Sequence, residues 1–305
     1  MTFLGRRQLG SRECVVETRL MTGAGWEWDP SLYAGSAAYY AEGRVPYPEE
    51  LGDALARELG LDGSGRLLDV GCGPGSLTLL LAPRFGHAVG MDADPQMLAE
   101  GRRRAAATGI ANVEWVHRRA EDLSLDLGSF RVATLAQSFH WMDRERVAGL
   151  VRELLTADGA LVHVHATTHQ GIEGESALPH PGPPRREIEA LVRQFLGTRR
   201  RAGRGHRTGI VVGEAEPGQD EARIYRAVGF VRPTRIEVPG QVVVRSTDQV
   251  VASVFSLSYA APHLFGDRAP RFEQGLRTLL ADVSPDGMFS EQMREIAVDI
   301  WRLQQ

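Results

Sequence analysis

A glycine-rich loop placed between two acidic residues carries the clearest chemistry in this sequence. The loop Gly71–Gly75 holds three alternating glycines and follows directly on the apolar run Leu67–Val70. Glycine lets the backbone approach a ligand closely and adopt dihedral angles that a Cβ would forbid. Asp69 lies just before the loop, and Asp92 lies about twenty residues beyond it. These residues predict a ligand site with a carboxylate at each end.

The spacing of the glycines distinguishes between two kinds of ligand. A dinucleotide site is typically G-x-G-x-x-G/A, and here Ser76 stands where the last glycine belongs. Asp69 would repel a pyrophosphate but would attract a cationic amino group. Asp92 lies where a ribose-binding carboxylate is expected. A ligand with a ribose, a positive amino end and no phosphates is S-adenosylmethionine.

Five motifs then follow one another in a familiar order. The runs LLDVGCGPGSLTLLLA, VGMDADPQML, RAEDL, AQSFHWMD and LLTADGALVHV span residues 66–165. In this order the motifs resemble the class I S-adenosylmethionine-dependent methyltransferases. The closer resemblance is to the small-molecule (type 11) group that includes trans-aconitate and ubiquinone/menaquinone methyltransferases. The segment AAYYAEGRVPYP (Ala37–Pro48) resembles one found upstream of the fold in that group.

The resemblance implies a role for each matching residue. The loop residues Gly71, Cys72, Gly73 and Gly75 would lie under the methionine part of the cofactor, with Asp69 near its ammonium group. Asp92 would bind the ribose, and Ala93 and Met97 would lie beside the adenine. Gln137 and Ser138 would lie under the sulfonium, and Tyr40 and Arg44 would close over the cofactor. The contact with the adenine amino group stays open among Ala120, Glu121 and Asp122. The implied product is S-adenosylhomocysteine.

The methyl acceptor decides whether a catalytic base is needed. A carboxylate needs none, whereas a phenol, hydroxyl or activated carbon does, and histidine suits neutral pH best. His140, directly after an expected strand, is the candidate base for O- or C-methylation. The alternative is that His140 and Trp141 only roof the cofactor pocket.

Further aromatic residues and histidines are candidates for substrate binding. They are Trp141, His165, Phe255, Tyr259 and His263. His163 and His165 alternate on one strand and therefore share a face. The alternative for the aromatic stretch 253–265 is a place in the core. We identify no third ligand beside the two histidines, and therefore expect no metal site.

Alternating periodicities predict the elements that position these residues. Strand-length apolar runs occur at Arg66–Val70, Ala88–Met91, Val113–Val116, Val132–Ala136 and Ala160–Val164, and helical stretches at Ser76–Phe85, Pro95–Ala107 and Arg144–Leu155. Asp94 and Asp143 immediately precede two of the helices, as N-caps do. Such alternation predicts an α/β fold with a doubly wound, mainly parallel sheet. With the class I resemblance we expect seven strands, and a helical cap over them.

The rest of the chain is less regular. We expect helices at Arg186–Leu196, Glu221–Val228, Asp248–Tyr259, Arg271–Ala281 and Ser290–Leu303, and strands at Thr234–Val238 and Gln241–Arg245. The expected domains are an N-terminal extension, partly disordered (1–36), a cofactor-binding core (37–167), an insertion forming part of the cap (168–220), the rest of the sheet (221–246) and a C-terminal helical cap (247–305). Translation could begin at Met1 or at Met21.

Composition excludes several kinds of chemistry. The sequence has no lysine among its 35 basic residues, which is typical of a GC-rich, for example actinobacterial, genome. Lysine nucleophiles and pyridoxal Schiff bases are therefore excluded. Only two cysteines, the lack of a signal peptide and the lack of a membrane-length apolar run predict a cytoplasmic protein. The net charge of −4 argues against nucleic-acid and membrane partners, despite the arginine cluster at 199–207.

The expected activity is thus methyl transfer to a small molecule by a monomer or homodimer. Two other functions stay open from the sequence. A relative of the fold could hold the cofactor without transferring methyl, as a cyclase or regulator. A dinucleotide-dependent oxidoreductase is disfavoured by Asp69 and Ser76.

Overall fold

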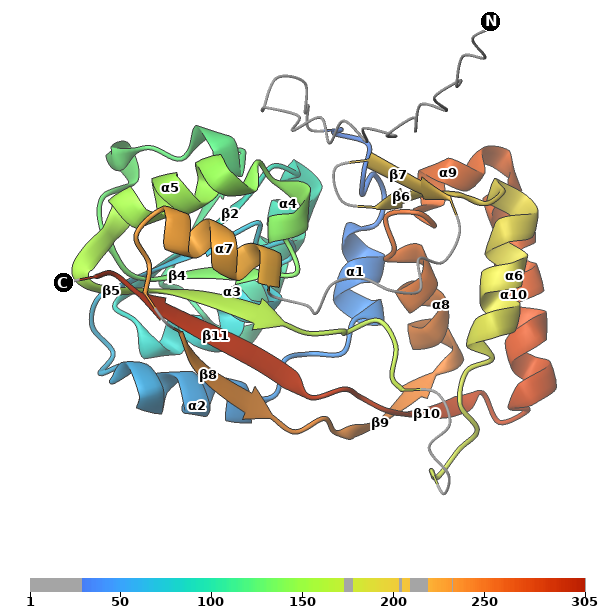
Figure 1. Ribbon diagram of the computed structural model, residues 1–305. Helices are drawn as coiled ribbons and strands as arrows, with labels where there is room; N and C mark the ends of the chain where they lie inside the picture. The colour runs from blue at the N-terminus through green and yellow to red at the C-terminus, as the bar shows by residue number, and fades with distance from the viewer. Residues whose placement is uncertain (1–28, 173–177, 203–204, 209–218, 232, 305) are drawn as a thin grey trace, which may run out of the picture.

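A seven-stranded sheet forms the centre of the larger part of the molecule (Figure 1). The computed structural model describes residues 29–172, 178–202, 205–208, 219–231 and 233–304. The strand order is β3-β2-β1-β4-β5-β11-β8. The strands are β1 (Arg66–Val70), β2 (His87–Asp92), β3 (Val113–His117), β4 (Phe130–Ala136), β5 (Leu155–His165), β8 (Thr234–Val238) and β11 (Ile296–Arg302).

The first five strands are parallel, as the sequence predicts, and the last one enters in the opposite direction. β11 lies between β5 and β8 and is antiparallel to both. The reversal of strand order lies between β1 and β4, which are parallel neighbours. Ligands of such sheets bind beyond the carboxyl ends of the strands at this point. The glycine loop follows β1 and lies there.

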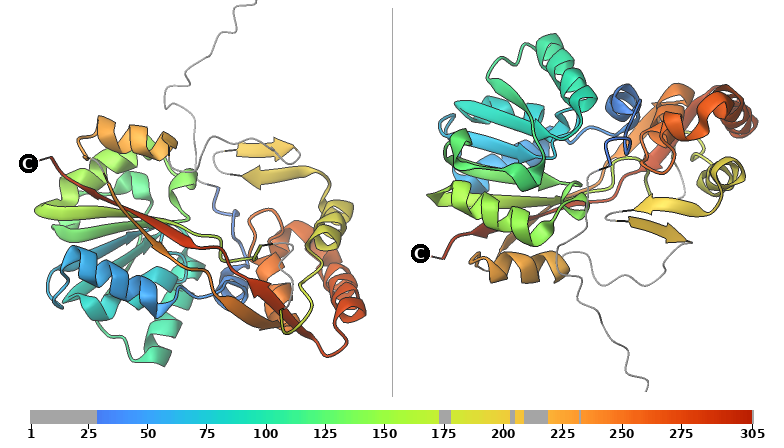
Figure 2. Two further views of the ribbon diagram at one scale, coloured as in Figure 1. Left: turned by 60° about the horizontal axis from the view of Figure 1, so that its bottom comes forward. Right: turned by 90° about the horizontal axis from the view of Figure 1, so that it is seen from above.

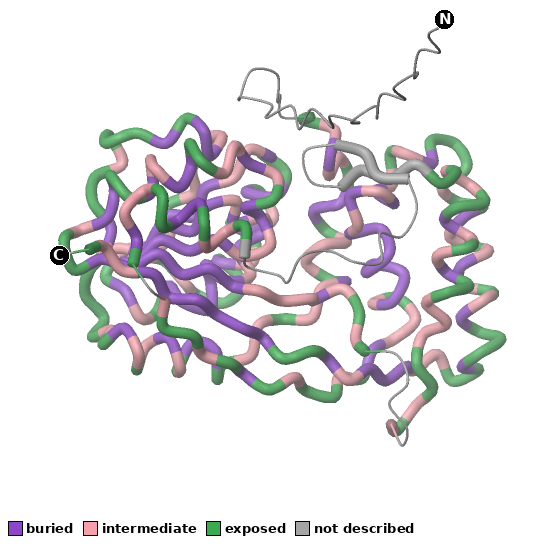
Figure 3. The backbone as a smooth tube through the Cα atoms, viewed as in Figure 1, coloured by how far each residue is buried: buried purple, intermediate pink, exposed green. Residues whose placement is uncertain are grey.

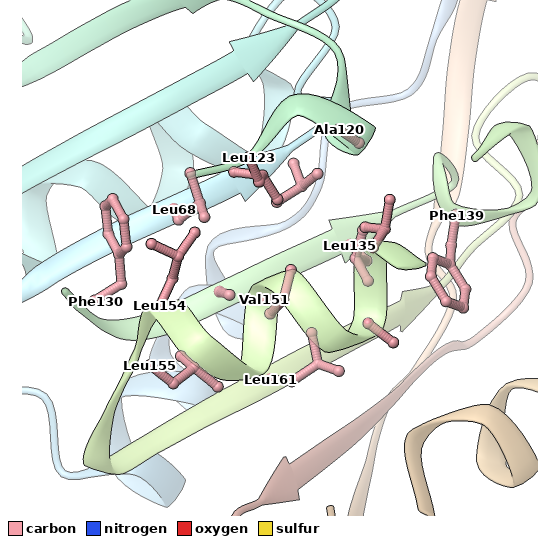
Figure 4. Close-up of a cluster of buried hydrophobic side chains, with 14 of the residues drawn as sticks. Leu68, Ala120, Leu123, Phe130, Leu135, Phe139, Val151, Leu154, Leu155 and Leu161 are labelled. Carbon is pink, nitrogen blue, oxygen red and sulfur yellow. The ribbon is translucent and has the colours of Figure 1, made fainter. Parts of the chain in front are cut away.

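Helices cover both faces of the sheet. The helices are α2 (Glu49–Leu59), α3 (Ser76–Leu81), α4 (Pro95–Thr108), α5 (Arg144–Leu154) and α7 (Gln219–Ala227). α2 and α3 contribute to one apolar core, while α5 and α7 contribute to the other. Figure 4 shows Val151 and Leu154 of α5 lying against strand residues such as Leu68, Leu135 and Leu161. Figure 3 shows that burial is concentrated along these strands.

Local sequence signals set the helix ends. The Asp94 carboxylate accepts hydrogen bonds from the Gln96 and Met97 N–H groups, and Asp143 caps α5 in the same way. Both N-caps that the sequence predicts are therefore confirmed. α2 was not expected; it begins after Pro48 and ends at Gly60, whose φ of +58° suits a glycine at a helix C-terminus. Between β3 and β4 lie only short 3₁₀ turns, η2 (Ala120–Asp122) and η3 (Leu125–Leu127), where the sequence analysis places no helix.

The prediction of a C-terminal helix at Ser290–Leu303 is wrong. The segment forms β10 (Met288–Gln292) and β11. Six of the seven residues of β11 are buried, from Ile296 to Trp301. A strand that is covered on both faces shows no alternation of polar and apolar residues, so its periodicity cannot be distinguished from that of a buried helix. The seventh strand of the sheet thus comes from the segment that was assigned to the cap.

A second layer of helices lies beyond the carboxyl end of β5 and has its own apolar core (Figures 1 and 2). It contains α1 (Ala37–Gly43), α6 (Arg185–Leu196), α8 (Thr247–Phe255), α9 (Pro262–Phe265) and α10 (Ala269–Val283), with the short turn η5 (Gly266–Arg268) between α9 and α10. Two further short turns are η1 (Ala82–Arg84), after α3, and η4 (Phe139–Trp141), after β4. We call the α1, α6 and α8–α10 layer the cap.

Two small sheets accompany the cap. β9 (Val242–Ser246) pairs with β10, and β6 (Arg199–Ala202) pairs with β7 (Gly205–Thr208). The expected strand Gln241–Arg245 therefore does not continue the main sheet, because its partner β10 lies on the cap side of β11. β8 does join the main sheet, at its edge.

Some expectations concern residues outside the described ranges. The start at Met21 and most of the N-terminal extension lie there, as do the side chains of the arginine cluster at 199–207. Within the described ranges, every helix is too short or too polar to cross a bilayer.

Candidate functional site

The three glycines of the loop share a backbone conformation but differ in what surrounds them. All have positive φ, +68° at Gly71, +56° at Gly73 and +75° at Gly75. A Cβ at Gly71 would lie 2.6 Å from the Ser138 Cβ, and one at Gly75 would lie 2.4 Å from the Trp115 ring. A Cβ at Gly73 would meet nothing within 4 Å. Gly71 and Gly75 therefore permit internal packing, while Gly73 faces open space.

The N–H groups of the loop are already bonded within the protein. Gly71 and Cys72 donate to the Met91 carbonyl at 2.8 and 3.0 Å, Gly75 donates to the Cys72 carbonyl at 3.0 Å, and Gly73 donates to the Asp92 carboxylate at 2.8 Å. A phosphate-binding loop instead presents free N–H groups to its ligand. The loop geometry is therefore unsuited to a pyrophosphate.

Asp69 lies beneath the loop. Its place just before the loop in the sequence had suggested a position at the edge of the loop instead. The residue is 1% exposed, and its carboxylate accepts hydrogen bonds from the Thr78 hydroxyl at 2.6 Å and the Thr134 hydroxyl at 2.7 Å. The Thr78 N–H in the first turn of α3 also donates to it. Burial raises the pKa of Asp69 above its usual value, against these hydrogen bonds. The position at a helix N-terminus that a phosphate would take is thus filled by a carboxylate of the protein.

Asp92 lies at the end of β2 and reaches across to the loop. Its two carboxylate oxygens accept hydrogen bonds from the N–H groups of Gly73 and Asp94, both at 2.8 Å. Burial raises the pKa of Asp92 from 3.8 to about 6, although both hydrogen bonds favour the ionised form. The carboxylate is ionised at neutral pH, and it lines the same cavity as Asp69.

A cavity opens above the loop, between the sheet and the cap. It holds about 1000 Å³ of empty space, its open mouth included. It gathers most of the predicted cofactor residues: Tyr40, Arg44, Asp69, Gly71, Cys72, Gly73, Asp92, Ala93, Met97, Ala120, Glu121, Gln137 and Ser138, together with Trp141. Of the three candidates for the adenine amino group, Ala120 and Glu121 line the cavity, and Asp122 does not.

The cavity also has wall residues that the sequence analysis did not single out. They include Tyr33, Val45, Tyr47, Ser76, Leu77, Arg118, Arg119, Ala136, Met142 and Thr168. Tyr47 lies in the same upstream segment as Arg44, so the resemblance of that segment could have indicated it. Tyr33 comes from the expected extension, and Thr168 from the first residues of the expected insertion, so both domain boundaries pass through the site.

Gln137 has an unusual backbone conformation at the end of β4. Its φ is +56°, the only positive value of a non-glycine residue in the part of the chain that is described. Its side-chain amide donates to the Tyr47 hydroxyl at 3.0 Å and to the Thr168 hydroxyl at 3.3 Å. Strained backbone of this kind is found mostly at functional sites, where the surrounding structure maintains it.

Aromatic rings and one arginine form the cap side of the cavity. Tyr33 makes edge-to-face contacts with Tyr40 and Trp141, with ring centroids 6.2 and 6.1 Å apart. The Arg44 guanidinium lies 4.4 Å from the centroid of the Tyr40 ring and donates to the Ser256 hydroxyl and carbonyl, at 2.8 and 3.1 Å. Arg44 therefore links the cavity to the end of α8.

Several predicted residues lie elsewhere. His140 is exposed and is not part of the cavity wall; its ring lies 4.8 Å from that of Trp141. The structure thus places the candidate base His140 on the surface, outside the cavity where methyl transfer is expected. Gly75 and Asp122 are also outside the wall.

The other residues predicted to bind substrate, apart from Trp141, also lie outside the cavity wall. His165 pairs with Asp299 at 3.0 Å, on the sheet, and the Phe255 ring packs in the cap core against Phe265 and Phe272. His263 contacts the Ala34 carbonyl at 3.0 Å, and Tyr259 packs against the cap core. An amphipathic stretch of aromatic residues can line a pocket or pack in a core, and here its aromatic residues Phe255 and Tyr259 pack in or against the cap core. Among the described residues we find no cluster of three or more metal-ligating side chains.

Comparison with known proteins agrees with this geometry. Residues 67–159 match the family model described as a methyltransferase domain. An uncharacterized methyltransferase of Mycobacterium bovis is 32% identical over 177 residues, which are 56% of this chain and 69% of that protein. A trans-aconitate 2-methyltransferase of Mycobacterium ulcerans is 38% identical over 86 residues, 27% of this chain and 30% of that protein.

Among solved structures, N-methyltransferase NodS from Bradyrhizobium japonicum, in complex with S-adenosylhomocysteine, aligns with 91% of this chain and all of that one. The TM-score is 0.47 and the identity 13%. The sequence relatives, the family model and the sheet that carries the glycine loop lead to one family. The chain belongs to the class I S-adenosylmethionine-dependent methyltransferases.

Proposed function

We propose that the protein transfers the methyl group of S-adenosylmethionine to a small-molecule acceptor, on oxygen or carbon. The observation that carries this proposal is the loop Gly71–Gly75, which faces the cavity at Gly73 but has no free N–H group at the four positions described above. Such a loop suits a ligand without phosphates. When bound, the cofactor supplies an electrophilic methyl group on a sulfonium.

The residues of the cavity fit that cofactor along its length. Asp92 would accept from the ribose hydroxyls, and Ala93, Met97, Ala120 and Glu121, which line the same cavity, would lie beside the adenine. Asp69 lies below the loop, where it favours an ammonium group. No described carboxylate lies within ion-pair distance of Arg44. A carboxylate at the amino-acid end of the cofactor would balance its charge.

The protein contributes positioning and exclusion of water. Tyr33, Tyr40 and Trp141 cover the cavity with a rigid aromatic wall. Ser138 donates to the Val70 carbonyl at 2.8 Å and so holds the end of β4 against β1. Orienting two reactants in this way can supply roughly 7–11 kcal/mol of the barrier reduction. A general base is not required for that contribution, and exposed His140 would need to turn inward to serve as one.

A small-molecule acceptor is supported by the shape of the site. The cap carries its own apolar core and lies over the carboxyl ends of the strands (Figure 2). The space that remains is of the size that encloses small ligands. A folded nucleic acid would need an open basic groove instead.

Calorimetry with S-adenosylhomocysteine tests the cofactor. The protein should bind it with a micromolar Kd, Asp92→Ala should abolish binding, and NADH should give no heat. Asp122→Ala is the matched control, because this neighbouring carboxylate lies outside the cavity wall. Binding of NADH in place of the nucleoside, by well-folded protein, would refute the proposal.

A further inference from the structure

Two hydroxyl groups in the cavity have protons that no group in the described part of the chain accepts. Gln137 Nε2 has two hydrogens, and it donates one to the Tyr47 hydroxyl and the other to the Thr168 hydroxyl. Each hydroxyl oxygen is therefore an acceptor in these bonds. Neither hydroxyl donates to any group in the described part of the chain, although both residues line the cavity.

The protonation of Tyr47 keeps its hydroxyl a donor. Burial raises the pKa of Tyr47 well above its usual value of 10, and nearby Tyr40 and Asp69 act in the same direction. The hydrogen bond from Gln137 and the charge of Arg44 lower the pKa but do not outweigh burial. The phenol is therefore protonated throughout the physiological range.

The backbone holds this arrangement firmly. The Val45 N–H donates to the Thr168 carbonyl at 2.8 Å, which ties the segment that carries Tyr47 to the end of β5. Gln137 takes its left-handed conformation between them, with φ of +56°. Such pre-organised donors bind a fixed group without the cost of reorienting.

The hydroxyls of Tyr47 and Thr168 lie apart from the end of the cavity where the nucleoside is expected. In the sheet, β1 lies between β2 and β4, and β5 follows β4. Asp92 ends β2, whereas Gln137 follows β4 and Thr168 follows β5. The two donors thus lie on the side of the glycine loop away from Asp92, where the second reactant has to enter.

The cavity offers this reactant donors but no ready base. Its three acidic side chains, Asp69, Asp92 and Glu121, already accept hydrogen bonds from protein groups. No histidine is part of the cavity wall within the described residues. An acceptor that is already anionic needs no proton removed, and two O–H donors match the two oxygens of a carboxylate.

We propose that Tyr47 and Thr168, oriented by Gln137, bind the reacting carboxylate of the acceptor, so that the enzyme makes methyl esters. The proposal rests on the proposed methyl transfer. One carboxylate oxygen forms a bond to the methyl carbon, the carbon–sulfur bond breaks, and its electron pair goes to sulfur. The sulfonium becomes a neutral thioether, the carboxylate becomes a neutral ester, and no proton is released.

The test uses acetate, a small carboxylate, on protein saturated with S-adenosylhomocysteine. Acetate and acetamide, which have the same shape, are titrated separately and followed by calorimetry or NMR. The wild-type protein should bind acetate at least tenfold more tightly than acetamide. The double variant Tyr47→Phe with Thr168→Val should lose this preference while its Kd for S-adenosylhomocysteine changes less than threefold.

Two further variants guard the interpretation. Gln137→Glu reverses the hydrogen bonds, since the new carboxylate would accept from both hydroxyls, and it should abolish acetate binding without removing either hydroxyl. Tyr39→Phe removes a hydroxyl from α1 at a ring that packs on Phe255, and should change nothing. Thermal unfolding of every variant establishes that it is folded.

Three outcomes would overturn the inference. Equal binding of acetate and acetamide would show that Tyr47 and Thr168 do not select a carboxylate. A tenfold or greater loss of S-adenosylhomocysteine affinity in the double variant, with the fold intact, would assign the hydroxyls to the cofactor. A methylated product that resists alkali, which cleaves esters to methanol, would show another acceptor atom. Failure of the wild-type protein to bind S-adenosylhomocysteine would refute the proposed function instead, so the two failures are distinguishable.

Discussion

The Asp92 carboxylate accepts a hydrogen bond of 2.8 Å from the Gly73 N–H, and this bond joins the end of β2 to the glycine loop. It occupies the N–H of Gly73, the loop residue where a Cβ would meet open space, and it holds a half-buried carboxylate beside the expected ribose. Because the contact leaves the Gly73 N–H bonded within the protein, the loop suits the proposed ligand, a nucleoside without phosphates. We expect the same contact to make binding of that ligand sensitive to pH.

Affinity for S-adenosylhomocysteine should fall as the pH is lowered through the pKa of Asp92. With a pKa of about 6, the ionised fraction that can accept from two ribose hydroxyls drops about tenfold between pH 7 and pH 5. The Kd should rise by about the same factor in calorimetric titrations. Asp92→Asn should bind weakly at both pH values, with no such dependence. A wild-type Kd that stays constant over this range would contradict the assignment.

The stability of the protein without ligand should depend on pH in the opposite direction to its affinity for the cofactor. The raised pKa means that the folded state holds this proton more tightly than the unfolded state. The stabilising contribution is complete below pH 4 and is lost as the pH rises through about 6. Thermal unfolding without ligand should show this loss in the wild type and not in Asp92→Asn.

Gly73→Ala should abolish cofactor binding while the protein stays folded. The new methyl group would project into the cavity, and the left-handed backbone would add roughly 1–2 kcal/mol of strain. Gly109→Ala is the matched control, because Gly109 also has positive φ and open space but ends α4 away from the cavity. Equal cofactor affinity in the two variants would contradict the placement of Gly73.

Gly75→Ala should act on stability instead. Its Cβ would lie 2.4 Å from the Trp115 ring, and a Cβ at Gly90 or Gly101 would also lie within 3.0 Å of that ring, so the ring has little space to move. The protein should unfold at a lower temperature than Gly73→Ala in the same calorimetric scan. A Tm equal to that of Gly73→Ala would show that the ring can move away.

Glu291→Gln should destabilise the packing of α6 against β9 and β10 beside the cap by about 3 kcal/mol or more. Glu291 pairs with Arg185 at 2.7 Å and with Arg245 at 2.9 Å, and all three side chains are largely buried. Burial raises the pKa of Glu291, but the two arginines outweigh it and hold the pKa below its usual value. This stabilisation is present at neutral pH and is lost as the pH falls through the lowered pKa.

Urea unfolding of Glu291→Gln, compared with Glu237→Gln, measures that contribution. Glu237 pairs with Arg235 in an exposed position, so its replacement should cost less than about 1 kcal/mol. If the two variants lose the same stability, the buried cluster contributes no more than a surface pair.

His140→Ala should leave turnover within about twofold of the wild type. His140 is exposed outside the cavity wall, whereas its neighbour Trp141 lines the cavity and contacts Tyr33. Trp141→Ala should therefore lower kcat much more. A tenfold fall in kcat for His140→Ala, with unchanged cofactor affinity, would restore it as a base that turns inward during the reaction.

The sequence by itself determined the parts of this protein that depend on local chemistry. The glycines of the loop, the acids Asp69 and Asp92 and the caps Asp94 and Asp143 are set by backbone dihedrals and short-range hydrogen bonds, which leave a signature in neighbouring residues. Alternation of strands and helices was equally visible over residues 66–165. The family and the cofactor followed from these features.

Only the tertiary structure decided what depends on contacts between distant segments. The sequence pattern of β11 resembles that of a buried helix, because burial on both faces removes the alternation of polar and apolar residues. Phe255 packs in the cap core and His165 forms an ion pair, although both residue types suit a pocket equally well. Tyr47, Gln137 and Thr168 meet only because β4, β5 and the upstream segment end at one edge of the sheet, and no local pattern records that meeting.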